Sequence, residues 1–274
     1  MLTFINGLSI LLPIFYVIVL IDYALLFFRD DPFAKKTVNI LLKISISLHV
    51  ILIVFRTSVY QHIPIASIFE VFSALSLAII LVYLYIEEIT RVRTTGLFIM
   101  VFVFVFQLIS SVFQTMTVEI SPLLTSKFFG IHVAFAIFGY SAITISAIYG
   151  FMYLMLYHDI KSSKFGIIYS RLPSLEVLGN MNYSSALIAF IFMTFAIILG
   201  SVWSSMSINT YWNWDPKLIS VIITWLIFGV GVCAKKFLGF SGKKIAYISL
   251  FGFFVMLFSM IVVNLFIPTF HEFI

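Results

Sequence analysis

Long apolar runs alternate with short polar connections along the whole 274-residue chain. A bilayer core about 30 Å thick requires about 20 apolar residues per helical span, and most of the runs are close to or above that length. Several runs are dense in Phe, Ile and Val, but their length and lack of strict alternation favour helices over strands. The pattern predicts an all-α polytopic membrane protein with about eight transmembrane helices. The expected spans cover residues 4–28, 38–56, 66–86, 97–114, 128–156, 184–202, 218–234 and 245–267.

The composition excludes a soluble protein. Hydrophobic residues make up 62% of the chain and charged residues 10%, and the mean hydropathy is +1.17. So few charges cannot cover the surface of a soluble domain. The longest connection covers about residues 157–183, so we expect a single transmembrane domain over residues 1–274. No cleavable signal pattern precedes the first run, which is long enough to remain as a span.

The basic residues predict the orientation of the chain. A net charge of +5 could suggest a nucleic-acid partner, but the positions of the charges argue against one. Twelve of the sixteen Lys and Arg residues lie in four alternate connections, which the positive-inside rule places in the cytoplasm. Both termini are then extracytoplasmic. The twelve residues are Arg29, Lys35, Lys36, Arg91, Arg93, Lys161, Lys164, Arg171, Lys235, Lys236, Lys243 and Lys244.

One connection, residues 203–217, is rich in aromatic residues. It joins the runs 184–202 and 218–234, and the orientation above places it outside the cytoplasm. Aromatic residues are common anchors at membrane interfaces, so a simple interfacial belt is the competing interpretation. The loop holds three of the four tryptophans together with other rings and charges: Trp203, Tyr211, Trp212, Trp214, Asp215 and Lys217.

Three histidines are expected on the same side as this loop. His132 lies about one turn inside the outer end of the run 128–156, His271 follows Pro268 after the last run, and His62 lies in an outer loop. Two neutral imidazoles can ligate haem iron on opposite faces, and indole and phenol rings offer a flat apolar wall. Lys217 or the indole N–H groups could meet the haem propionates.

Other polar positions within or near the spans have mainly structural interpretations. For Asp22, a buried pairing or a snorkelling side chain is favoured over a proton relay. His49 is expected to be a hydrogen-bond partner between helices, and Glu70 to form a polar pair near an outer histidine. Residues 161–183 are expected to lie on the inner leaflet as an interfacial segment. The single cysteine, Cys233, excludes an internal disulfide and a CxxCH haem-attachment motif.

The aromatic loop resembles the tryptophan-rich "WWD" signature of the CcsA/ResC cytochrome c assembly proteins, a family that includes a HemX-like group. The resemblance covers most of the chain. Three positions depart from the family pattern: Ile208-Asn209 replace Trp-Gly, Leu218 replaces an acid, and Cys233 replaces a histidine of a second, membrane-embedded haem site. Cys233 could act as a thiolate ligand or be a small buried apolar residue. The matching segments are Gly200-Ser-Val-Trp203, Tyr211–Lys217, His62-Ile-Pro64 with Glu70, Arg171–Glu176, Gly130-Ile-His132 and His271.

The resemblance implies haem handling at the outer face of the bacterial cytoplasmic membrane. His132 and His271 would be the axial ligands of a haem b that is bound non-covalently and transiently. Trp203, Tyr211, Trp212, Trp214, Asp215 and Lys217 would shape its platform. The haem would be delivered to an apocytochrome c, with a CcsB/ResB-like membrane partner completing a cytochrome c synthase, or haem lyase. No catalytic nucleophile or base is needed, and the enzyme status of this chain alone is left open.

Two other functions remain open. The family's HemX-like members imply a non-catalytic membrane regulator or scaffold of haem biosynthesis. A transporter of haem or small solutes would need a charged or broken-helix site at the membrane midplane. Asp22 and His49 are the main candidates for such a site in the sequence.

Overall fold

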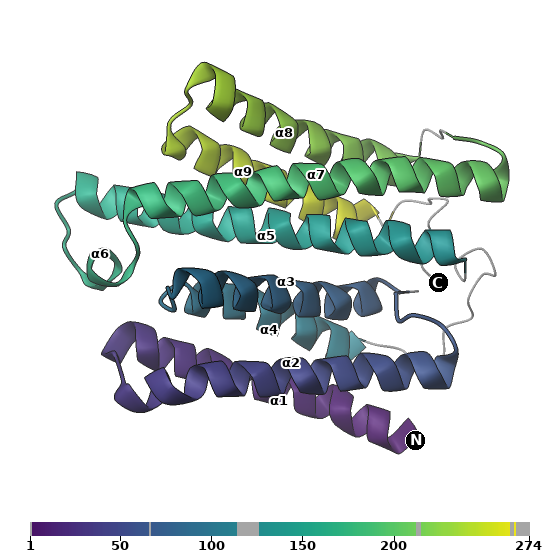
Figure 1. Cartoon of the computed structure of the whole chain (residues 1–274), viewed down its shortest axis with the longest axis horizontal. Coiled ribbons are helices and arrows are strands. Elements are labelled where there is room, and N and C mark those ends of the chain that lie inside the picture. The colour runs from purple at the N-terminus through teal and green to yellow at the C-terminus, as the bar shows by residue number, and fades with distance from the viewer. Residues whose placement is uncertain (1, 66, 114–125, 212–214, 264–265, 267–274) are drawn as a thin grey trace. The chain divides into compact units, whose positions relative to one another are not determined.

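The protein is all-helical in the part of the chain that the structure, a computed structural model, describes (Figure 1). This part is residues 2–65, 67–113, 126–211, 215–263 and 266. Eight of its helices are long and apolar enough to cross a membrane, which confirms the predicted number of spans. The chain divides into two compact units, Met1–Val118 and Glu119–Ile274. Whether the two units act as one domain stays a prediction.

The first unit contains four antiparallel helices, in which α1 packs on both α2 and α4, and α3 packs on α4. The connections have typical helix caps. Asp31 accepts hydrogen bonds from the backbone N–H groups of Phe33 and Ala34, and Pro32 occupies the first helical position. The four helices are α1 (Leu2–Arg29), α2 (Pro32–Tyr60), α3 (Ile68–Thr90) and α4 (Gly96–Phe113).

A hydrogen-bonded chain of buried side chains crosses all four helices of this unit. The Tyr16 hydroxyl lies 2.7 Å from Nδ1 of His49, and Nε2 of His49 lies 2.9 Å from Oγ of Ser73. The Ser73 hydroxyl donates to Oε1 of Gln107 at 3.0 Å. Ser73 therefore accepts from Nε2–H of His49, and Nδ1 accepts from Tyr16. Both imidazole nitrogens are occupied, which confirms His49 as a helix–helix hydrogen-bond partner.

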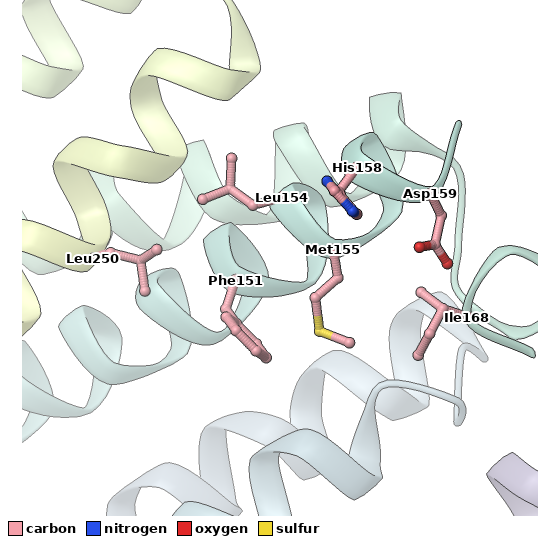
Figure 2. A pocket seen from close by; sticks show the side chains of 7 residues that line it. All are labelled: Phe151, Leu154, Met155, His158, Asp159, Ile168 and Leu250. Carbon is pink, nitrogen blue, oxygen red and sulfur yellow. The ribbon is translucent and has the colours of Figure 1, made fainter. Parts of the chain in front are cut away.

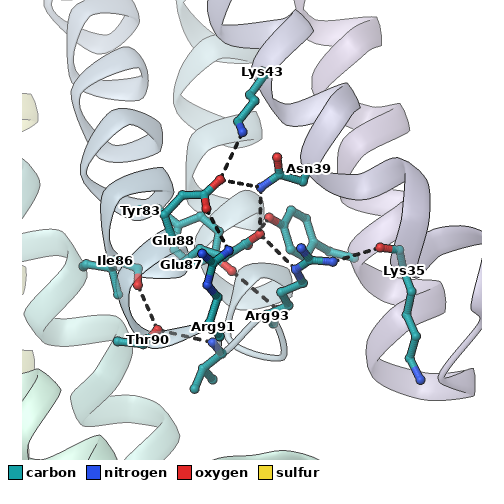
Figure 3. A network of polar contacts seen from close by, with 12 residues as sticks. Lys35, Asn39, Lys43, Tyr83, Ile86, Glu87, Glu88, Thr90, Arg91 and Arg93 are labelled. Carbon is teal, nitrogen blue, oxygen red and sulfur yellow. Dashed lines mark hydrogen bonds and ion pairs between the residues drawn. The ribbon is translucent and has the colours of Figure 1, made fainter.

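A second polar network lies at the end of this unit where α1 turns into α2 (Figure 3). The buried Glu87 carboxylate accepts a hydrogen bond from Tyr23 at 2.5 Å and pairs with Arg93 at 3.4 Å. Nearby, Asp22 is buried and accepts a hydrogen bond from Thr37 at 2.6 Å, which confirms the buried pairing expected for this acid. These contacts satisfy acids that would otherwise be costly within a span.

The second unit is built around the long antiparallel pair α5 and α7, which run side by side in Figure 1. Helix α9 packs on α5, and α8 packs on both α7 and α9. The helices of this unit are α5 (Lys127–Lys161), α6 (Ile167–Arg171), α7 (Leu175–Ile208), α8 (Pro216–Leu238) and α9 (Gly242–Phe258), followed by the π-helical turn η2 (Ser259–Val263).

Helices α5 and α7 extend beyond the apolar core that the sequence predicts. At 1.5 Å per residue, the 35 residues of α5 span about 52 Å. Helix α7 begins at Leu175, so the expectation of an interfacial segment up to residue 183 is wrong for its last part. The Ser174 side chain caps α7 by accepting the Val177 N–H at 3.3 Å, and Glu176 lies in the first turn, where the helix dipole favours an acid.

Candidate functional site

The predicted haem-binding residues fall partly within the described structure. His132, Trp203, Tyr211, Asp215 and Lys217 are described. Trp212, Trp214 and His271 lie outside the described residues, as does Pro268. The five described residues belong to the end of the second unit where α7 leads to α8.

His132 lies near the start of α5 and is held by a backbone group of α7. Its Nδ1 lies 2.8 Å from the carbonyl oxygen of Ala196. A carbonyl oxygen can only accept, so Nδ1 must carry the proton, and in the neutral imidazole Nε2 keeps its lone pair. The half-buried ring is thus oriented as metal-binding histidines commonly are, with one nitrogen fixed by a carbonyl.

The buried Trp203 side chain, near the end of α7, packs against the start of α5. Its indole Nε1–H donates to Oγ of Ser126 at 3.1 Å, and its ring packs against Phe129 with centroids 5.1 Å apart. Ser126 also caps α5 by accepting the Phe129 N–H at 3.1 Å, and the Phe129 and His132 centroids are 6.3 Å apart. The Trp203 indole N–H therefore has an acceptor within the protein, and Trp203 packs on the end of α5 that carries His132.

Asp215 and Lys217 are organised by the start of α8. Asp215 is buried and caps the helix by accepting the Lys217 backbone N–H at 2.8 Å, and Pro216 occupies the first helical position. The half-buried Lys217 side chain lies within electrostatic range of both Asp215 and His132. The structure therefore brings His132, Trp203, Asp215 and Lys217 into one region of the second unit.

Tyr211 stands apart from this arrangement, with 69% of its surface exposed. Its exposed ring is suited to contact a lipid or an incoming molecule. Among the described residues, no hydrogen bond or ring contact joins Tyr211 to His132. Its predicted place in a haem platform stays a prediction.

Several residues that shape the site are absent from the predicted set: Ser126, Phe129, Ala196 and Gly200. Ser126 could have been found as an N-cap immediately before an apolar helix. Gly200 belongs to the quoted motif but had no assigned role, and a Cβ on it would lie 2.7 Å from Cε1 of His132. The Ala196 carbonyl is a backbone group, so no side-chain pattern identifies it.

The remaining candidate ligands have other surroundings. Glu70 does form a polar pair, but with the buried Arg56, at 2.8 Å. His62 lies 2.9 Å from the carbonyl of its neighbour Ile63. Cys233 is exposed, so its interpretation as a buried apolar residue is wrong. Among the described residues, no group of three or more His, Cys, Asp or Glu side chains could hold a metal ion.

A cavity of about 460 Å³ lies near the opposite end of α5 (Figure 2). Its lining is almost entirely apolar, with His158 and Asp159 as its polar members. His158 follows His132 by 26 residues, about 39 Å along the helix, so this cavity is separate from the site around His132. The lining residues are Phe151, Leu154, Met155, His158, Asp159, Ile168 and Leu250.

Comparisons with known proteins agree with the fold and with the quoted motifs. Residues 65–271 match the family model described as Cytochrome C assembly protein. The chain is 27% identical over 232 residues to "Cytochrome c biogenesis protein CcsA" of Heterosigma akashiwo (strain NIES-293 / 8280G21-1), covering 72% of each chain. It is 25% identical over 280 residues to the protein with the same description from Prochlorococcus marinus (strain MIT 9301), covering 92% of this chain and 89% of that one.

A solved structure shares the fold. The chain superposes on "Cytochrome c Heme Lyase CcmF" with a TM-score of 0.69 at 14% sequence identity. The match covers 95% of this chain and 46% of that protein, so this chain spans about half of its length. At this identity the likeness shows a common helical architecture.

Proposed function

The chain belongs to the cytochrome C assembly protein family and has a role in cytochrome c biogenesis, and from that membership we propose that it binds haem and presents it to apocytochrome c. Haem is the cargo of this reaction, a haem b held transiently and without a covalent bond. The protein contributes positioning and protection of the iron, while the iron and the porphyrin vinyl groups supply the reactivity.

The observation that carries this proposal is the hydrogen bond that fixes the tautomer of His132. Its Nδ1–H donates to the Ala196 carbonyl, which leaves Nε2 as the nitrogen that can donate a lone pair to iron. His132 is the first axial ligand, and His271, outside the described residues, is the second. Lys217 lies close enough to interact electrostatically with His132, so it is suited to pair with a haem propionate.

The proposed site is extracytoplasmic. Each connection at the opposite end of the second unit is basic: Lys161 ends α5, Lys164 and Arg171 follow it, and Lys235 and Lys236 end α8. The positive-inside rule assigns these connections to the cytoplasm. His132 and the tryptophan loop then face outward, where a bacterial cytoplasmic membrane would present haem to a secreted apocytochrome. A CcsB/ResB-like membrane protein is the proposed partner.

A maturation assay tests haem delivery. The chain is co-expressed with a CcsB/ResB-like partner and an apocytochrome c containing CxxCH, in bacteria lacking their own assembly system. We expect haem that stays attached to the cytochrome in a denaturing gel, and a loss of at least tenfold with His132→Ala. The exposed His158→Ala, at the other end of α5, should mature cytochrome normally. Equal maturation with wild type and His132→Ala would contradict delivery from this site.

The exposed position of Cys233 supports a second candidate function. In the family, a histidine of a membrane-embedded haem site is expected there, and an exposed cysteine does not replace it. A HemX-like regulator or scaffold of haem biosynthesis would not need that site. In the assay above, this function predicts no cytochrome maturation in any combination, but an altered cellular haem content when the chain is deleted.

A further inference from the structure

Gly200 of α7 faces the His132 ring at a distance that leaves no room for a side chain. A Cβ built on Gly200 would lie 2.7 Å from Cε1 and 2.9 Å from Nδ1 of His132. Both distances are below 3.0 Å, and real Cβ atoms essentially never approach another heavy atom so closely. The imidazole therefore occupies the volume that any other residue at position 200 would fill.

Position 200 also controls access to the carbonyl that holds the ring. In an α-helix, the N–H of residue 200 bonds to the carbonyl of residue 196, four residues earlier. Helical side chains point back toward the N-terminus, so a side chain at position 200 would cover that carbonyl. With glycine there, the carbonyl oxygen of Ala196 can accept a second, lateral hydrogen bond from Nδ1 of His132 at 2.8 Å.

We propose that Gly200 is a positioning residue, which opens the Ala196 carbonyl to His132 and thereby fixes Nε2 as the iron-coordinating nitrogen. This inference rests on the proposed function of His132 as a haem ligand. A carbonyl partner on the second ring nitrogen also makes an imidazole a more basic ligand. A more basic ligand stabilises ferric over ferrous iron, so the same contact lowers the reduction potential of the bound haem.

The direct test is Gly200→Ala in the purified full-length protein loaded with haem. The added methyl group meets the end of a side chain with two rotatable bonds, so the ring should rotate away and lose its bond to Ala196. We expect haem affinity to fall about 10- to 100-fold, as for other partners of metal-ligating histidines. The remaining bound haem should be partly high-spin and should have a higher reduction potential.

Gly139→Ala is the matched control in the same helix pair. Gly139 lies two turns from His132 on α5, and its Cβ would lie 2.8 Å from Sδ of Met193 on α7. This variant introduces the same methyl group at a similar distance, without touching His132. It should keep the low-spin spectrum and the reduction potential of the wild type. If the two variants shift both properties equally, general loosening of α5 against α7 explains the effect, and the positioning role is overturned.

If Gly200→Ala folds poorly, a double-mutant cycle keeps the inference testable. It compares the melting temperatures of the wild type, Gly200→Ala, His132→Ala and the double variant. Gly200→Ala should lower the melting temperature of the haem-free wild type. It should lower that of haem-free His132→Ala less, because this variant lacks the ring that the added methyl group meets. Equal shifts in both backgrounds would overturn the claimed contact. A wild type that takes up no haem would instead overturn the proposed function, and the ligand role of Nε2 with it.

Discussion

Two histidines in membrane helices show how neighbouring atoms decide the role of a residue. His49 has both ring nitrogens within hydrogen-bond distance of side chains, Tyr16 on one side and Ser73 on the other. His132 has Nδ1 fixed by a carbonyl, which leaves a lone pair on Nε2. The residue type is the same, but only the second arrangement suits a metal ligand in the neutral ring.

This difference predicts a structural effect for His49→Ala. The change leaves the buried Tyr16 hydroxyl without its acceptor and removes packing, so we expect a loss of about 2 kcal/mol or more in unfolding free energy. The haem spectrum should be unchanged once the protein is folded. Thermal unfolding in detergent and the absorption spectrum measure the two effects. Loss of bound haem from a folded His49→Ala protein would assign His49 a ligand role that its hydrogen bonds argue against.

At the level of helices, the sequence predicts the number of spans well and their ends poorly. Hydropathy detects the lipid-facing part of a helix, so it identified all eight spans. It missed the nine residues from Leu175 to Tyr183 because Glu176, Asn180 and Asn182 interrupt the apolar residues there, and the cap at Ser174 sets the true start. The same applies to α5, which continues past residue 156 to Lys161.

The helix caps predict a difference between Ser126 and Ser174. Both serines cap a long helix, but Ser126 also accepts the Trp203 indole N–H. Ser174→Ala should cost about 1 kcal/mol, the usual value of an N-cap. Ser126→Ala should cost about 1 kcal/mol more, because a buried indole N–H loses its acceptor. Thermal unfolding measures both; equal losses would show that the bond to Trp203 contributes nothing.

At the level of the whole molecule, the sequence predicts which residues belong to the candidate site but not how they contact one another. The tryptophan loop and His132 were both predicted, and the structure places Trp203, Lys217 and His132 in one region of the second unit. The roles of Ala196 and Gly200 depend on which turn of α7 faces α5. Residue types do not encode that register, so only tertiary structure reveals it.

The charge-derived orientation predicts which loops face the outside of the cell. In a Cys233→Ser background, Tyr211→Cys should react with a membrane-impermeant maleimide on intact cells. Ser162→Cys, in the basic connection after α5, should react only after the membrane is opened. Both positions are exposed, so accessibility to the reagent reflects sidedness. The opposite labelling pattern would place the tryptophan loop in the cytoplasm and contradict extracytoplasmic haem delivery.

The absorption spectrum of the purified protein, oxidised and then reduced with dithionite, tests the account most directly. With haem supplied, the wild type and His158→Ala should show sharp low-spin bands. His132→Ala should lose haem or turn high-spin, because iron loses the Nε2 ligand that the Ala196 carbonyl orients. An unchanged low-spin spectrum in His132→Ala, or no haem uptake by the wild type, would contradict a haem site at His132.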